Sequence, residues 1–150
     1  MRSRLTAPAF VVTLLLLGSR VSRAQTLSVS GNPGALQVTT AVAGSQPTAV
    51  SNAATTYTVT TPNANKTYRI TAQLNANMPA GVTLTLTLAA PPSATSAGAV
   101  TLTTAAQNVV TGIPKNTNAT RAITYQLTGN TSAGVIASTN RLVTLTLVTP

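Results

Sequence analysis

Residues 82–88 read V-T-L-T-L-T-L, a strict alternation of aliphatic and hydroxyl side chains. A period of two is typical of a β-strand, because successive side chains of an extended chain point to opposite faces. The aliphatic residues are expected to face a core, and the threonines to face outward. Threonine is β-branched and therefore favours the extended backbone on the outer face as well. The stretch predicts a strand with one buried face, around which we expect the rest of the chain to be organised.

Similar alternation recurs along the chain, and no stretch after the first 24 residues has the apolar period of a helix. The segment 43–54 is small and polar, which predicts a flexible connection, and 55–61 with 67–75 is expected to form a hairpin. About eight short strands at this spacing predict an all-β fold, an antiparallel β-sandwich of immunoglobulin-like or pilin-like layout. The other expected strands are 26–42 in two pieces, 99–104, 109–113, 120–128 and 142–148.

The N-terminus has the pattern of a secretory signal peptide at 1–24. Two arginines lie among the first four residues, an apolar run follows at 10–17, and Ser22 and Ala24 provide a small-residue cleavage site. The apolar run is too short for a membrane span, which needs about 20 residues. We therefore expect a secreted, extracellular or cell-surface protein, with the periplasm as the alternative, and no transmembrane segment after cleavage.

The mature chain is expected to form a single β-sandwich domain, 25–150, with an extended N-terminal strand segment at 26–42. The sequence contains no Asp, Glu, His or Cys. General acid–base catalysis and metal binding draw on these residues, so we predict no catalytic residue, no metal site, no cofactor and no enzyme activity. A Ser–Lys pair through Lys66 or Lys115 stays formally open, although both lysines lie in Asn-rich segments that predict solvated loops.

Nine Lys and Arg residues give the sequence its positive charge, and four of them belong to the signal peptide. The other five are scattered and come without the aromatic residues of a nucleic-acid surface, so nucleic acid is excluded as a partner. With no side-chain carboxylate to pair with, these cations are solvated or attract an anionic envelope polysaccharide; a solvated surface is the favoured interpretation. They are Lys66, Arg69, Lys115, Arg121 and Arg141.

Two further surface features bear on partners. The three tyrosines alternate with polar residues in a way that predicts core-facing side chains, which leaves no aromatic platform for a sugar. Asn65, Asn118 and Asn130 each begin an Asn-x-Ser/Thr triplet in a predicted loop and are candidate glycosylation sites.

Several short motifs resemble a group of exported, uncharacterised bacterial β-sandwich proteins. They are GNPGAL at 31–36, ITAQL at 70–74, PAGVTL at 79–84, AGAVTL at 97–102, NVVTGI at 108–113 and ITY at 123–125. These motifs are turns and strands, so the resemblance implies a fold and no activity. The layout is more loosely similar to that of pilin-type and immunoglobulin-like surface subunits, which is an analogy of fold.

These patterns predict a structural surface protein that self-associates, as a homo-oligomer or a filament. The extended N-terminal segment could pair within its own chain, which is the favoured interpretation, or complete the sheet of a neighbour by strand addition. The residues expected to form such a strand-donor interface are Leu27, Val29, Leu36, Val38 and Val42. The alternative function is a module of adhesin type that binds a surface glycan or an envelope polymer through its loops.

Overall fold

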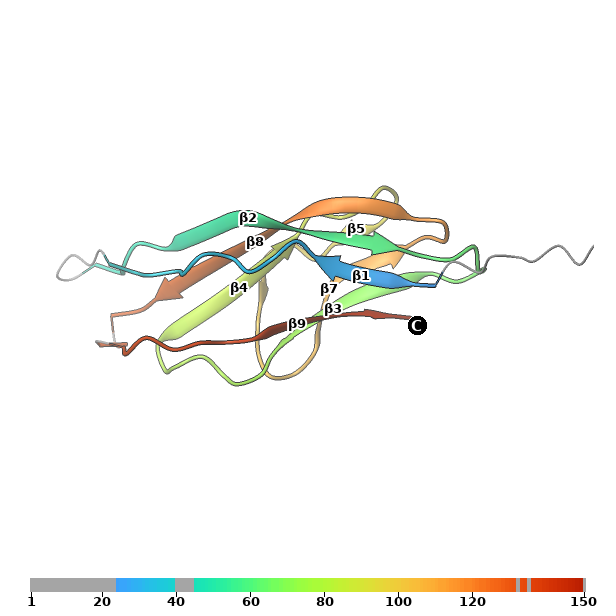
Figure 1. Cartoon of the computed structure of the whole chain (residues 1–150). Helices are drawn as coiled ribbons and strands as arrows, with labels where there is room; N and C mark the ends of the chain where they lie inside the picture. The colour runs from blue at the N-terminus through green and yellow to red at the C-terminus, as the bar shows by residue number, and fades with distance from the viewer. Residues whose placement is uncertain (1–23, 40–44, 132, 135, 150) are drawn as a thin grey trace, which may run out of the picture.

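The chain folds into two antiparallel β-sheets that pack face to face, as Figure 1 shows for the computed structural model. The structure describes residues 24–39, 45–131, 133–134 and 136–149. Within these ranges there are nine strands and no helix, so none that could cross a membrane. The expected all-β antiparallel sandwich is therefore confirmed. The strands are β1 (Thr26–Val29), β2 (Val50–Thr60), β3 (Tyr68–Leu74), β4 (Val82–Leu88), β5 (Thr95–Ser96), β6 (Val100–Thr101), β7 (Gln107–Ile113), β8 (Asn118–Gly129) and β9 (Val143–Val148).

Strands that are neighbours in a sheet are mostly far apart in the sequence. The first sheet has the order β1-β2-β8-β4-β6, and the second has the order β5-β7-β3-β9. The expected strand at 82–88 is present as β4 and pairs with β8 along its whole length. On its other side β4 pairs with β6 only at Thr85 and Leu86. β1 and β9 are the outermost strands on the same side of the sandwich (Figure 1).

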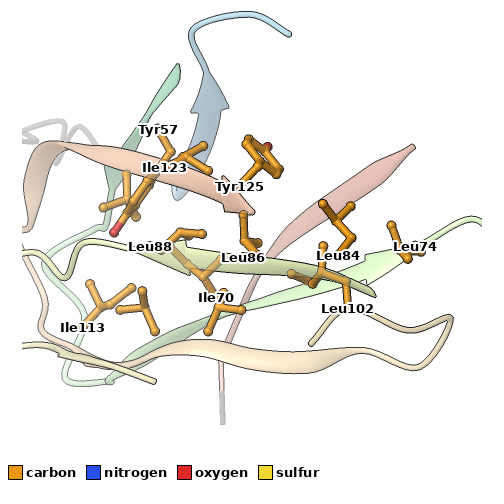
Figure 2. Packing of buried hydrophobic residues seen from close by; sticks show 14 of the residues in the cluster. Tyr57, Ile70, Leu74, Leu84, Leu86, Leu88, Leu102, Ile113, Ile123 and Tyr125 are labelled. Atoms are coloured by element: carbon orange, nitrogen blue, oxygen red, sulfur yellow. The ribbon is translucent and has the colours of Figure 1, made fainter. Parts of the chain in front are cut away.

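The core lies between the two sheets, where the inward side chains of β2, β3, β4, β7 and β8 meet (Figure 2). In β4, Leu86 and Leu88 are fully buried while the intervening threonines stay partly exposed, as the alternation predicts. The chain has no cysteine to form a disulfide. Burial of each large aliphatic side chain contributes about 1.5–3 kcal/mol, so this packing is the main source of stability.

The hairpin predicted for residues 55–61 and 67–75 is wrong, because these segments correspond to β2 and β3, which belong to different sheets. The chain between them crosses from the first sheet to the second. Thr61 fixes this crossing: its hydroxyl donates to the carbonyl of Pro114 at 2.8 Å, and its oxygen accepts from the backbone N–H of Thr117 at 2.9 Å. The alternation was correct for each strand, but it carries no information about which strand is the partner.

Two further expectations need correction. β2 begins at Val50, inside the segment expected to be a flexible connection, because β8 supplies backbone partners to Val50, Ser51 and Asn52. The second piece expected within 26–42 forms no regular strand in its described part, residues 36–39.

Candidate assembly site

β1 and β9 are the edge strands on one side of the sandwich, which we call the open side because among the described residues no strand pairing joins the two sheets there (Figure 1). Among the described residues, β1 pairs only with β2, and β9 pairs only with β3. β1 and β9 contact each other, but no regular pairing joins them. The outer edge of β9 thus presents backbone N–H and C=O groups that another strand can pair with.

A groove with a volume of about 1330 Å³ and a mixed apolar and polar lining lies along this open side. Its lining includes the first half of β9, the N-terminal part of the chain and the described residues between β8 and β9. The start of β4 and the end of β8 line it as well. The aliphatic and Met side chains in its lining are Leu27, Val29, Leu36, Val38, Met78, Val82, Leu84, Leu127, Ile136, Leu142, Val143 and Leu145.

β4 and β9 have the same alternating sequence but differ in burial. Leu86 and Leu88 of β4 are fully buried, whereas the inward residues of β9 (Val143, Leu145 and Leu147) stay partly exposed. The difference comes from position, since β9 has β3 on one side and the open side of the sandwich on the other. The apolar face of β9 therefore lacks cover that a further extended segment could supply.

Residues 31–39, which we call the strap, lie at the groove without joining a sheet. Leu36 and Val38 are partly buried, and Leu36 packs against the core. The backbone N–H of Ser30 donates to the carbonyl of Thr56 at 2.9 Å, which fixes the end of β1. After Ser30 no backbone hydrogen bond joins residues 31–39 to the rest of the described chain. Within the described part of the chain, the strap is thus held by side-chain packing and not by backbone hydrogen bonds.

The five residues expected to form a strand-donor interface fall into different parts of the structure. Leu27 and Val29 lie in β1, opposite Val59 and Tyr57 of β2 in the same chain. Leu36 and Val38 lie in the strap, and Val42 lies outside the described residues. The acceptor side, the edge of β9 with its partly exposed residues, was not found from the sequence. Its alternation matches that of β4, and only the strand order shows that one side of β9 is uncovered.

The five cations after residue 24 are dispersed over the structure. Lys66 and Lys115 line one pocket of about 500 Å³ at the loops after β2 and β7. The Nε atom of Arg121 donates to the carbonyl of Ala90 at 3.2 Å, and that of Arg141 donates to the carbonyl of Asn77 at 3.0 Å. These two arginines are therefore engaged with backbone carbonyls, whereas the two lysines share a pocket. The fifth cation, Arg69, lies in β3, and its Nε atom is buried.

The three tyrosines are buried, as their alternation predicts. Tyr57, Tyr68 and Tyr125 are 0%, 2% and 5% exposed. The hydroxyl of Tyr57 donates to the carbonyl of Ala89 at 2.6 Å. Burial raises the pKa of Tyr57 to about 12, against the opposing effect of the Arg121 charge, and burial also raises the pKa of Tyr125. None of these rings is available on the surface to stack on a sugar.

The candidate glycosylation residues differ in their settings. Asn65 is exposed in the loop between β2 and β3, as expected. Asn130 follows directly after β8 and is also exposed. Asn118 was expected in a loop, but it is the first residue of β8 and pairs with Thr60 of β2. The hydroxyl oxygens of Thr120, in the same triplet, and Thr58 are 2.7 Å apart and share a hydrogen bond.

The fold and this open side define an all-β sandwich with an incompletely covered edge strand. The groove offers apolar side chains and strand backbone, which suit an extended peptide segment. No protein-family model, curated protein or solved structure matches the chain.

Proposed function

We propose that this protein is an exported, non-enzymatic structural component of a cell surface or an extracellular filament. Copies join by adding a strand at the open side of the sandwich. The observation that carries the proposal is found on β9, which combines an unpaired outer edge with apolar residues left partly exposed beside a groove. An added strand supplies both missing partners, because its backbone pairs with the edge and its alternate side chains enter the groove.

The expected leader supports export, and the missing catalytic residue types support a non-enzymatic role.

The surface that accepts a strand differs from the segment that provides one. Contacts of this kind are heterologous and do not close on themselves unless the rotation between copies closes a ring. Where the rotation does not close a ring, growth continues from copy to copy and produces a filament.

The test uses the mature protein beginning at Gln25, studied by light scattering and negative-stain microscopy. We expect particles that grow with concentration and appear as filaments. Two variants of one strand provide the comparison: Leu145→Lys places a charge in the groove, whereas Thr144→Lys places it on the exposed outer face. Leu145→Lys is expected to abolish assembly and Thr144→Lys to retain it, with circular dichroism verifying that both fold. A monodisperse monomer of the unsubstituted protein at high concentration would refute the proposal.

The alternative, a glycan- or envelope-binding module, ranks second. The feature in its favour is the pocket shared by Lys66 and Lys115, where two positive charges could attract an anionic polysaccharide. The burial of all three tyrosines argues against stacking on sugar rings. The test is retention of the protein on an anionic polysaccharide column at about 0.15 M salt, an ionic strength at which distant surface charges are already screened. Retention that is lost in the double variant Lys66→Ala/Lys115→Ala would favour this alternative.

A further inference from the structure

We infer that the strand added to β9 is the strap of a second copy, and that residues 35–39 become a regular strand when they bind there. This inference rests on the proposed function and names the segment that acts as donor. It also divides the N-terminal segment into two parts with different roles. β1 stays paired with β2 in its own chain, and only the strap is exchanged.

The first argument is the match between what the strap lacks and what β9 lacks. Residues 35–39 already alternate as a strand does, because Leu36 and Val38 are partly buried while Ala35, Gln37 and Thr39 are exposed. Their backbone nevertheless has no hydrogen-bond partner elsewhere in the described chain. β9 has alternating residues facing the same groove and an equally unpaired edge. Pairing residues 35–39 with β9 gives hydrogen-bond partners to the backbone N–H and C=O groups of both segments.

The second argument concerns why the donor comes from another copy. β1 is tied to β2, and Gly34 lies close to Asn52 of β2, so the strap of each chain follows the first sheet. β9 belongs to the second sheet, on the other side of the groove. A strap that arrives from a neighbour has no such tether to the acceptor's first sheet. It can therefore align with β9 along its length.

The sequence around the strap allows it to leave its own groove. Gly31 has a φ of +149° and no atom within 4 Å of the position that a β-carbon would take, so the chain can turn freely there. The five residue steps from Ser30 to Ala35 span at most about 17 Å when extended. The neighbour's β9 must therefore lie close to the end of β1, which makes this a compact contact between two copies.

The alternation fixes which residues would meet. Leu36 and Val38 must enter the groove beside Val143 and Leu145, since a slip of one residue would turn them to solvent. Gln37 then lies on the outer face of the second sheet. Its neighbours on that face are the exposed residues Thr144 and Thr146 of β9.

Because the natural chain has no cysteine, single cysteines can report this contact without background. One preparation of the mature protein carries Gln37→Cys, and a second carries Thr144→Cys or Thr146→Cys. The two are mixed, allowed to assemble and oxidised. A disulfide requires Cα atoms about 4.4–6.8 Å apart, so only adjacent strands will cross-link efficiently. The control partner is Thr111→Cys, which is exposed on β7 in the same sheet.

We expect the mixed dimer of Gln37→Cys with a β9 cysteine to exceed the Thr111→Cys control severalfold. If the protein assembles but no mixed dimer exceeds the control, the strap is not the donor and this inference is wrong. The proposed function would then still stand, because assembly was observed. The absence of any assembly would overturn both.

A second pair of variants separates a donor strand from a segment that only covers its own groove. Val38→Lys places a charge at a partly buried position of the strap, and Gln37→Lys places it at the exposed neighbouring position. If the strap is the donor, Val38→Lys abolishes assembly, Gln37→Lys does not, and both remain folded by circular dichroism. If Val38→Lys assembles as well as or faster than the unsubstituted protein, the strap is merely a cover and the inference is wrong.

Discussion

Gly81 sits at a turn whose backbone and surroundings both exclude a side chain. Its φ is +77°, and a β-carbon there would lie 2.8 Å from the Cα atom of Ala133 and 2.6 Å from the Oδ1 atom of Asn130. The carbonyl of Gly81 also accepts a hydrogen bond of 2.8 Å from the backbone N–H of Asn130. The turn before β4 is therefore packed directly against the segment that follows β8.

We predict that Gly81→Ala destabilises the protein more than Gly98→Ala. Gly98 also has a positive φ, +74°, but no atom lies within 4 Å of its β-carbon position. Gly98→Ala therefore reports the backbone cost alone, about 1–2 kcal/mol, while Gly81→Ala adds a steric clash. Urea unfolding of both variants measures the difference. Equal midpoints would mean that the packing of Ala133 on Gly81 is absent in solution.

We predict that ionisation of the Tyr57 hydroxyl lowers the free energy of unfolding in alkaline solution. Its pKa is raised to about 12 in the folded state, from an unfolded value near 10. The folded state therefore holds the phenol proton more tightly, and the stability gained is complete below about pH 10 and is lost as the pH rises towards 12. Tyr57→Phe should cost about 0.5–1.5 kcal/mol at neutral pH, because the Ala89 carbonyl loses its partner.

The measurement is the free energy of unfolding of both proteins at several pH values between 7 and 12. The Phe variant should lose less stability than the unsubstituted protein above pH 10. An identical decline in the two proteins would exclude Tyr57 as the group responsible.

At the scale of elements, β4 and β9 allow a direct comparison of a covered and an uncovered strand. Leu86 is fully buried, so Leu86→Ala should cost about 2–5 kcal/mol in the free energy of unfolding. Leu145 is partly exposed in the groove, and Leu145→Ala should cost clearly less in a dilute sample. Urea unfolding at low protein concentration, where copies stay apart, gives both values. Equal costs would indicate that β9 is already covered in the isolated protein.

The same two strands show what a sequence can reveal about such a fold. Alternation located β4 and β9 within a residue and assigned their inward faces correctly, because side-chain direction is a local property of an extended chain. The partner of each strand depends on contacts distant in the sequence, and so the pairing of β2 with β3 was wrong. The acceptor edge depends on strand order as well, which is why only half of the candidate site, the N-terminal segment, was predicted.

At the scale of the whole molecule, no side chain titrates between about pH 3 and pH 8, because Asp, Glu, His and Cys are all missing from the sequence. Acid unfolding usually follows the protonation of carboxylates that are paired in the folded state. We therefore expect the urea midpoint of the protein to be nearly constant over this range, with only the chain ends contributing. A cooperative acid transition between pH 3 and 5 would contradict this expectation.

The strand order also has a consequence for how the molecule forms. β3 lies between β7 and β9, and β2 lies between β1 and β8, so both sheets join early and late parts of the chain. Folding that depends on such distant contacts is slow, on the order of milliseconds to seconds in small β-proteins. The second sheet also has to wait for β9, which follows β3, β5 and β7 in the sequence. During synthesis, neither sheet can therefore be completed before β8 and β9 have been made, although β2, β3 and β4 are made much earlier.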